Sequence, residues 1–305
     1  MKKFLGVDTS NYTTSVSVSE NGKIVSNHKI MLSVTDGQRG LRQSDAVFAH
    51  TVNLPKLFDE LGSITPSAVG VSAYPRDIEG SYMPCFLAGV STASAVANTM
   101  GVPLYRFSHQ SGHVAAALYS SDREDLIDKK FLAFHVSGGT TEILLVDNMN
   151  ITLLGGTKDI GAGKAIDRAG VFLGLKFPCG KELEVLAGET VGKIKNDKIS
   201  VKGLECNLSG LENKVIGLIN SNADKEYIAA YTISMICAVI DKLTENALNL
   251  YPNIPIVYSG GVMSNRFIKD KMSDKYGGIF AEPEYSCDNA AGIARLTELK
   301  YSGEI

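Results

Sequence analysis

The sequence predicts an α/β protein built from two similar lobes. A pattern of strand, hydroxyl-rich turn, strand, turn and strand occurs near the N-terminus and again about 130 residues later. Stretches with helical periodicity follow both copies of this pattern. The chain has 305 residues, 44% of them hydrophobic, which is enough for a large core and more often means two domains than one.

The first copy of the pattern covers residues 4–32. Residues 4–7 are apolar, as in a buried strand, and Asp8 to Asn11 form a polar turn. Residues 14–18 alternate like a half-buried strand, Asn21-Gly22 is a hairpin signal, and 23–32 reads as a third strand. A hydroxyl-rich turn between two strands can donate hydrogen bonds to a phosphate, although alone it is more often only a turn.

The second copy begins at residue 131. Residues 131–136 are apolar, 137–141 form a Gly/hydroxyl turn, and strand-like runs follow at 143–146 and 151–154. This duplication predicts two similar domains with a cleft between them, as in actin-like, sugar-kinase-like and Hsp70-like ATP-binding folds. We expect an N-terminal lobe at 1–105 and a C-terminal lobe at 106–305.

The remaining elements alternate between helix and strand. Residues 189–225 are polar and weakly periodic, which predicts a peripheral insertion. A final helix is expected after the loop at 282–289, with Asp288 or Asn289 as its cap. The expected helices are 46–61, 86–100, one beginning at 159–168 and 225–250, and the expected strands are 68–73, 254–258 and 279–281.

Three loops are candidates for binding a nucleotide. Two are the hairpin turns above, and the third is Gly260-Gly261, which leads from a strand toward a helix. Glycines in such a turn let the backbone approach a ligand, and a helix N-terminus favours an anion. Because three such loops occur in one chain, we interpret them as parts of a nucleotide site.

Two histidines indicate a metal site. His109 and His113 are four residues apart at the start of an alanine-rich run, so on a helix both imidazoles would lie on one face. The other interpretation is a helix N-terminus capped by Ser108, with two polar residues in its first turns. Both interpretations are open at this point.

A metal would need at least one further ligand. Asp288 is the best candidate by position, but a plain helix cap explains it equally well. Two imidazoles and one carboxylate suit iron(II), zinc or manganese. A metallopeptidase is disfavoured, because the position that would hold the general-base glutamate beside the first histidine is Gln110.

Composition limits the other functions. A formal net charge of −3 gives no support for nucleic-acid binding over the whole surface, so tRNA would need a local basic patch or a partner subunit. Five cysteines without CxxC spacing indicate reduced thiols in a cytoplasmic protein. We expect no signal peptide and no membrane-spanning run.

Eight short motifs, in order along nearly the whole chain, resemble the tRNA threonylcarbamoyladenosine synthase family, called TsaD in bacteria and formerly described as O-sialoglycoprotein endopeptidases. The matching pieces are Gly6-Val7-Asp8-Thr9-Ser10, His109-x-x-Gly112-His113, Val136-Ser137-Gly138-Gly139-x-Thr141, Gly163-x-Ala165-x-Asp167-Arg168, Gly174-Leu175-x-x-Pro178-x-Gly180, Ser209-Gly210-Leu211, Ser259-Gly260-Gly261-Val262-x-x-Asn265-Arg266 and Cys287-Asp288-Asn289.

The resemblance implies an actin-like ATPase fold and an acyltransferase. It implies that a metal, iron or zinc, is held by His109, His113 and Asp288, and orients the phosphate and carbamoyl group of an adenylate. The threonylcarbamoyl group then passes to N6 of an adenosine in tRNA. We assign catalytic roles to Asp8 and Lys164. The nucleotide, ATP or threonylcarbamoyl-AMP, would be bound by Val136, Ser137, Gly138, Gly139, Thr140, Asp167, Gly180, Gly260, Gly261 and Asn265.

Several positions depart from the family pattern. The acidic residues of the first turn are replaced by Ser10-Asn11-Tyr12-Thr13-Thr14, and Ser108 and Ser111 stand where the family has His and Glu. Further departures are Thr140 for His, Pro75-Arg76-Asp77 for Pro-Gly-Leu, Lys164 for Glu and Cys179 for Gly. Two alternatives to the tRNA enzyme therefore stay open: a paralogue that transfers a carbamoyl-type group to another acceptor, and a nucleotide-binding, non-catalytic subunit. We expect accessory subunits or a homodimer as partners.

Overall fold

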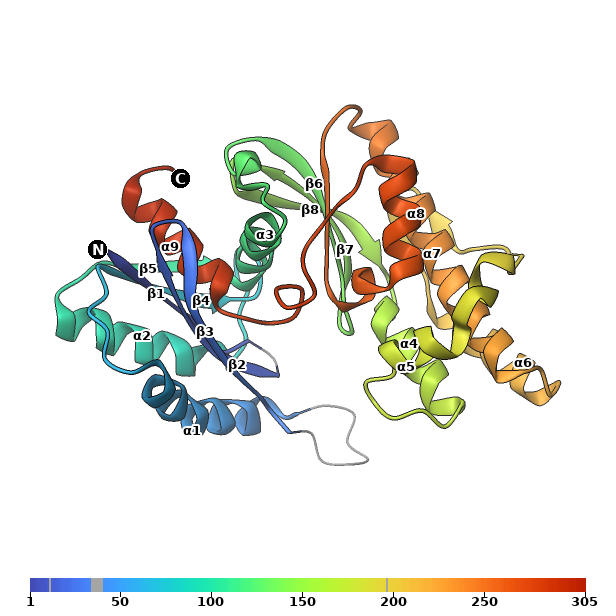
Figure 1. Cartoon of the computed structure of the whole chain (residues 1–305), viewed down its shortest axis with the longest axis horizontal. Coiled ribbons are helices and arrows are strands. Elements are labelled where there is room, and N and C mark those ends of the chain that lie inside the picture. The colour runs from blue at the N-terminus through green and yellow to red at the C-terminus, as the bar shows by residue number, and fades with distance from the viewer. Residues whose placement is uncertain (11, 34–40, 196) are drawn as a thin grey trace. The chain divides into compact units, whose positions relative to one another are not determined.

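The computed structural model describes residues 1–10, 12–33, 41–195 and 197–305 (Figure 1). Asn11, which belongs to the expected first turn, lies outside the described residues. The chain forms two compact units, each with its own β-sheet and packed helices. This confirms the expected α/β class.

Unit 1 contains Met1–Lys129, Asn148–Ile151 and Glu284–Ile305. Its sheet has the order β3-β2-β1-β4-β5, with β1 (Lys3–Asp8), β2 (Thr13–Glu20), β3 (Lys23–Met31), β4 (Ala68–Tyr74) and β5 (Leu104–Ser108). Its helices are α1 (Gln43–Leu61), α2 (Phe86–Met100), α3 (His109–Ser120) and α9 (Ala291–Ser302), with a 3₁₀ turn at Glu124–Leu126.

Alternation along β1 explains how helices cover both faces of this sheet. Leu5 and Val7 point into an apolar cluster with residues of α1 and α2, including Leu57 and Ala93. Gly6, between them, faces the other side, where an added Cβ would lie 2.5 Å from the Ala294 nitrogen of α9. Only a glycine lets α9 approach this close to the strand.

Unit 2 contains Lys130–Asp147 and Thr152–Pro283. Its sheet has the order β12-β11-β6-β7-β8-β10-β9, with β6 (Lys130–Val136), β7 (Thr141–Asp147), β8 (Asn150–Thr157), β9 (Val201–Lys202), β10 (Glu205–Cys206), β11 (Ile256–Ser259) and β12 (Ile279–Phe280). Its helices are α4 (Ala162–Phe172), α5 (Gly180–Ala187), α6 (Ser209–Asn220), α7 (Lys225–Leu250) and α8 (Arg266–Tyr276), with 3₁₀ turns at Gly188–Lys193 and Gly261–Ser264.

The expected duplication is present in the two sheets. In unit 1, β1 pairs antiparallel with β2 and parallel with β4. In unit 2, β6 pairs antiparallel with β7 and parallel with β11. The orders β3-β2-β1-β4-β5 and β8-β7-β6-β11-β12 are therefore equivalent.

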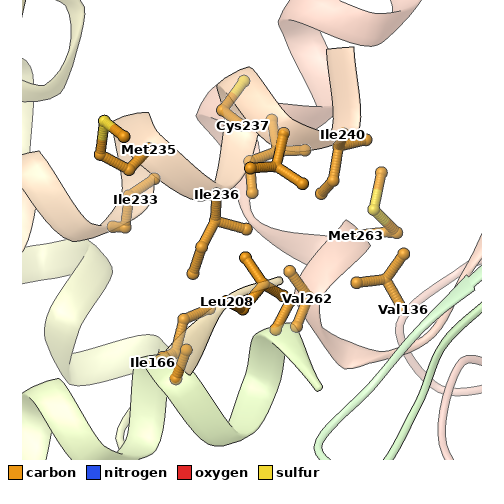
Figure 2. Close-up of a cluster of buried hydrophobic side chains, with 14 of the residues drawn as sticks. Val136, Ile166, Leu208, Ile233, Met235, Ile236, Cys237, Ile240, Val262 and Met263 are labelled. Carbon is orange, nitrogen blue, oxygen red and sulfur yellow. The ribbon is translucent and has the colours of Figure 1, made fainter. Parts of the chain in front are cut away.

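The core of unit 2 lies next to two of the three candidate nucleotide loops, the second and the third. Figure 2 shows Val136 of β6 and Val262 of the third loop among the side chains of α7. Val136 is fully buried and Val262 is nearly so. The apolar residues next to these two loops thus anchor them in the core.

The expected boundary between the lobes at residue 105 differs from the division between the two units. α3 and α9 pack on each other and belong to unit 1 with β1. The compact units instead divide at Lys129/Lys130, and the chain returns to unit 1 at Glu284. The return depends on contacts between distant residues, such as that of Gly6 with α9, which no local pattern encodes.

Residues 189–225 are more than the expected peripheral insertion. β9 and β10 extend the sheet of unit 2, since β10 pairs with β8. Leu208, Leu211 and Val215 are buried in the core of unit 2. The apolar residues of this segment are few and widely spaced among polar ones, so they form no clear helical or strand periodicity. The sequence therefore contains no sign that they belong to the core.

α7 is a core helix of unit 2. Within the described residues, it is the one helix that is long and apolar enough to cross a membrane, contrary to the expectation that no run reaches that length. However, 78% of its apolar window is buried inside the protein. This helix is therefore weak support for a membrane span.

Candidate functional site

The two histidines of α3 point at the same place. His113 Nε2 lies 2.9 Å from His109 Nε2, as expected for residues i and i+4 on one helical face. Ser108 caps this helix, because its Oγ accepts a hydrogen bond from the Ser111 nitrogen at 2.9 Å. The helix thus has both features that the sequence suggested: a Ser108 cap and a pair of histidines on one face.

Asp288 faces the histidines instead of capping α9. Its Oδ1 is 3.5 Å from His109 Nε2 and 3.3 Å from His113 Nε2. The Asn289 Oδ1 accepts a hydrogen bond at 3.0 Å from the nitrogen of Ala291, the first residue of α9, whose N-cap position is Ala290. Asp288 therefore faces the two imidazoles, and Asn289 makes the hydrogen bond at the start of α9.

These three donors fit a divalent cation. Ligands at 2.0–2.1 Å around a tetrahedral ion are separated by roughly 3.3–3.4 Å. The separations of 2.9, 3.3 and 3.5 Å lie close to that value. The donor atoms lie within 4.8 Å of one another, and two imidazoles with one carboxylate leave coordination positions open for a substrate.

Asp8 supports one of the histidines from behind. Its Oδ2 lies 3.4 Å from His109 Nδ1, the ring nitrogen that points away from the other donors. Asp8 is fully buried at the end of β1, and the Ser10 nitrogen and Oγ donate hydrogen bonds to its carboxylate at 3.1 and 2.7 Å. A carboxylate on the second nitrogen orients a metal-binding imidazole.

The charges in this cluster are strongly coupled. Burial alone would lower the pKa of His109, but the carboxylates of Asp8 and Asp288 raise it to about 10. Burial would raise the pKa of Asp288, but hydrogen bonds from the two imidazoles hold it well below its usual range. Such a concentration of buried charge is typical of a functional site.

Glycines bring α3 and the Asp288 loop together. A Cβ at Gly292, in the first turn of α9, would lie 1.9 Å from the Gly112 carbonyl oxygen of α3. The two helices therefore cross in backbone contact just beside the donors. This crossing places Asp288, from the C-terminal end of the chain, next to His109 and His113.

In unit 2, the turn between β6 and β7 is closed by its own hydroxyls. The Ser137 nitrogen donates to the Thr140 oxygen at 2.8 Å, and the Ser137 and Thr140 hydroxyls lie 2.8 Å apart. A Cβ added at Gly138 or Gly139 would meet no described atom within 4 Å. The turn thus has room for a ligand beside its backbone.

The first turn of α4 packs against this turn. The Gly163 nitrogen donates to the Ser137 oxygen at 3.0 Å, and the Ala162 nitrogen donates to Thr141 Oγ1 at 2.9 Å. A Cβ at Gly163 would lie 2.7 Å from the backbone of Gly138. A helix N-terminus and a glycine turn, both suited to a phosphate, are therefore in contact.

Replacing Gly163 with alanine is expected to push α4 away from the turn. We expect the free energy of unfolding to fall by about 1–3 kcal/mol and AMP affinity to fall about tenfold. Urea denaturation and calorimetry would measure these changes. Gly217→Ala in α6 is the control, because the added Cβ meets no described atom within 4 Å; equal losses in both variants would contradict this account.

The third loop approaches the second, the turn between β6 and β7, at Gly260. Its φ is 96°, and an added Cβ would lie 2.3 Å from the Val136 oxygen, so only glycine fits. Gly261 beside it is exposed. Asn265 caps α8 by accepting from the Ile268 nitrogen at 3.1 Å, so its amide oxygen already has a structural role.

The other predicted site residues of unit 2 lie on α4 and at the start of α5. The Asp167 Oδ1 accepts a hydrogen bond from the Cys179 nitrogen at 2.8 Å, and burial raises the pKa of Asp167. This bond brings Asp167 close to Gly180, the exposed first residue of α5. Lys164 is exposed on the first turn of α4, and its assigned catalytic role stays a prediction.

One cluster next to His109 and His113 did not follow from the sequence. Asp77 Oδ2 accepts hydrogen bonds from Ser108 Oγ at 2.6 Å and Ser111 Oγ at 2.8 Å. Burial and the neighbouring Asp77 raise the pKa of Tyr74. The loop after β4 is thus tied to the helix of the histidines. In the sequence, the only sign of this cluster was that Asp77, Ser108 and Ser111 differ from the family pattern. Asp77 is more than 30 residues from both serines, so their contact could not be read from local spacing.

Comparison with known proteins gives a consistent assignment. A family model described as tRNA N6-adenosine threonylcarbamoyltransferase (TsaD) matches residues 46–295. A protein of that name from Thermosipho africanus is 31% identical over 310 residues, covering 95% of this chain and 92% of its own.

Two solved structures share the fold. The activator of 2-hydroxyisocaproyl-CoA dehydratase from Clostridium difficile, with bound ADPNP, is 17% identical with a TM-score of 0.56, covering 99% of this chain and 97% of its own. A ROK family glucokinase from Streptomyces griseus, in complex with glucose and AMPPNP, is 12% identical with a TM-score of 0.53, covering 97% and 98%. The fold is the actin-like ATPase fold, as expected.

Proposed function

Because the chain belongs to the family of tRNA N6-adenosine threonylcarbamoyltransferases, we propose that it transfers a threonylcarbamoyl group from threonylcarbamoyl-adenylate to the N6 amine of an adenosine in tRNA. The observation that carries the proposal is the convergence of His109, His113 and Asp288. Family membership makes the chain an acyltransferase. The metal and the roles of the residues are the finer part of the proposal.

Iron(II) or zinc is the proposed cation. Two imidazoles and one carboxylate with open positions form the donor set of mononuclear iron sites, and zinc sites with three protein ligands also keep a position open. When bound, the cation would offset negative charge that develops at the carbonyl and on the leaving AMP. Asp8 would hold the His109 ring in position for this.

The adenylate would be bound in unit 2. The phosphate would lie beside Gly138 and Gly139 of the Ser137–Thr140 turn, where an added Cβ would meet no described atom within 4 Å, next to the N-terminus of α4. Lys164, exposed on that turn of α4, would add positive charge. The nucleotides in both solved neighbours support a nucleotide ligand.

The proposal includes a partner. A net charge of −3 is a poor match for the tRNA backbone, so accessory subunits or a second copy would supply basic surface. We place the protein in the cytoplasm, where the tRNA substrate is found, and four of the five free cysteines are buried. No membrane has a role in this proposal.

A different acceptor is the second candidate. Asp77, Ser108 and Ser111 form a hydrogen-bonded cluster at the start of the histidine helix, and all three depart from the family pattern. A changed cluster beside the donor atoms favours a changed acceptor. In this alternative the donor chemistry is the same and the product is not a modified tRNA.

Complementation tests the two candidates. The gene would be expressed in a bacterial strain depleted of its own tRNA-modifying synthase, and threonylcarbamoyladenosine in total tRNA would be measured by mass spectrometry. The His113→Ala variant would be expressed in parallel. Restoration by the wild type alone supports the tRNA enzyme; no restoration, with AMP and Zn²⁺ still bound by the purified protein, supports the other acceptor.

Asp8→Asn should weaken metal binding without unfolding the chain. The amide keeps the shape of the carboxylate but loses the charge opposite His109 Nδ1, so we expect about 10- to 100-fold lower affinity for Zn²⁺. Calorimetry with the purified protein would measure this, with Asp45→Asn on the exposed side of α1 as the control. Equal affinities for the two variants would rule out the supporting role of Asp8.

A further inference from the structure

Four lysines between α5 and α6 form a group of unpaired cations, which we call the lysine cluster. Lys193 ends the 3₁₀ turn after α5, Lys195 and Lys198 lie in the connection that follows, and Lys202 ends β9, the edge strand of the sheet of unit 2. All four are exposed. Within the described residues, none of them makes an ion pair with a carboxylate.

Apolar residues between these lysines attach the segment to the protein. Ile194, Ile199 and Val201 pack against the core of unit 2. The Asn207 nitrogen also donates a hydrogen bond to the Ser200 oxygen at 3.0 Å. The lysines are therefore presented to solvent by a backbone that is anchored on both sides of them.

The acidic residues of this part of the chain are paired with other cations. From residue 190 to residue 214, each described carboxylate has a partner outside the lysine cluster. The pairs are Asp197 with Lys214 at 3.2 Å, Glu205 with Lys158 at 2.8 Å, and Glu212 with Arg168. Glu189, in the 3₁₀ turn, is exposed. The balance is thus four positive charges against one, in a chain with a formal net charge of −3.

An exposed aromatic ring lies beside the same segment. Tyr227, in the first turn of α7, is 41% exposed and stacks on Tyr231, with the ring centroids 6.4 Å apart. The Tyr231 hydroxyl donates a hydrogen bond to Asp197 Oδ2 at 2.9 Å, which joins the ring pair to the segment of the lysines. Cations together with an exposed ring are the groups that bind an RNA backbone and an unpaired base.

We propose that the lysine cluster and Tyr227 form an RNA-binding surface of unit 2. The ammonium groups contact phosphates, and the Tyr227 ring stacks on an unpaired base. The inference rests on the proposed function, which makes a tRNA the substrate, and it locates a basic surface in a chain whose net charge is negative. Lysines contact phosphates as point charges, so this surface holds the RNA without reading its sequence. An acidic protein would satisfy the lysines but has no base for the ring.

The salt dependence of tRNA binding tests the lysine cluster. Each lysine that contacts a phosphate adds about 0.7–0.9 to the slope of log K against log salt concentration. We therefore expect a full-length variant with all four lysines changed to glutamine to bind an unmodified tRNA transcript with a slope lower by about 3, measured by fluorescence anisotropy.

A matched variant controls for total charge. It carries the same change at four lysines of unit 2 that are in ion pairs, namely Lys130, Lys242, Lys271 and Lys275. Because it loses the same formal charge at other places, it should keep the wild-type slope. Equal slopes in the two variants, or no binding of the transcript by the wild type, would overturn the proposal.

Variants of Tyr227 test the stacking contact. Tyr227→Ala should weaken tRNA binding about tenfold, the usual effect of removing one stacking ring, and leave the salt slope unchanged. Tyr227→Phe keeps the ring and should bind as the wild type does. Heparin, a polyanion without bases, should bind equally to the wild type and Tyr227→Ala. An equal loss for heparin and tRNA would contradict stacking.

The remaining outcomes separate other uses of the lysines and the fate of the proposed function. Tighter binding of polyglutamate than of tRNA would assign an acidic protein partner instead. Self-association of the lysine variant with an unchanged slope would mean that the lysines only protect the sheet edge at β9. An unchanged slope with tRNA modified in the complementation assay overturns the surface and leaves the proposed function intact. A lowered slope without modification by the wild type leaves the surface and overturns the proposed function.

Discussion

Asp288→Ala is expected to lower the affinity for Zn²⁺ by about 10²- to 10³-fold. A structural metal site with four ligands is worth about 10–16 kcal/mol, so one ligand is worth roughly 2.5–4 kcal/mol, or two to three powers of ten. The side chain is 24% exposed and makes its contacts with His109 and His113, so its removal should leave the fold intact.

Calorimetry and elemental analysis of the purified protein would measure this loss. Glu284→Ala is the matched control, because it removes an exposed carboxylate from the same loop. The control should bind Zn²⁺ as the wild type does. If Asp288→Ala keeps the wild-type affinity, the three residues are not the ligand set, and the metal part of the proposed function fails.

Gly292→Ala should both destabilise unit 1 and weaken its metal site. The new Cβ would lie 1.9 Å from the Gly112 oxygen and 2.8 Å from the Ala116 nitrogen, which are backbone atoms that cannot turn aside. α9 must therefore move away from α3. We expect the free energy of unfolding to fall by about 3 kcal/mol or more. We also expect Zn²⁺ affinity to fall, because Asp288 moves with α9.

Gly112→Ala is the control at the same helix crossing. Its Cβ would meet only the end of the Ile293 side chain, at 2.9 Å, which can change rotamer. The loss of stability, measured by urea denaturation, should therefore be clearly smaller than for Gly292→Ala. Equal losses would mean that the close backbone contact does not hold the two helices in place.

The predicted features that depend on local sequence agree with the structure. Ser108, His109 and His113 are within one helical turn and a half, so capping and the i, i+4 spacing could be read directly. The same is true of the strand–turn–strand pattern, which the two equivalent sheets confirm. In both cases the energy that selects the conformation comes from neighbours in the chain.

Features that depend on distant contacts could not be predicted in this way. Helix α5, strand β5 and the core residues of 189–225 were missed, and the expected lobe boundary differs from the observed units. Short elements have weak periodicity, and the partner of a helix is chosen by packing. The unit to which α9 belongs follows from its contacts with Gly6 and Gly112.

The sequence by itself determined the fold class, the duplicated hairpins, the histidine pair and the family. Only the tertiary structure showed that Asp288 faces His109 and His113, while its neighbour Asn289 accepts the hydrogen bond from Ala291 at the start of α9. It also placed Asp8 behind His109. The physical reason is that these groups meet through strand register and helix crossing, and both are set by packing between segments far apart in the chain.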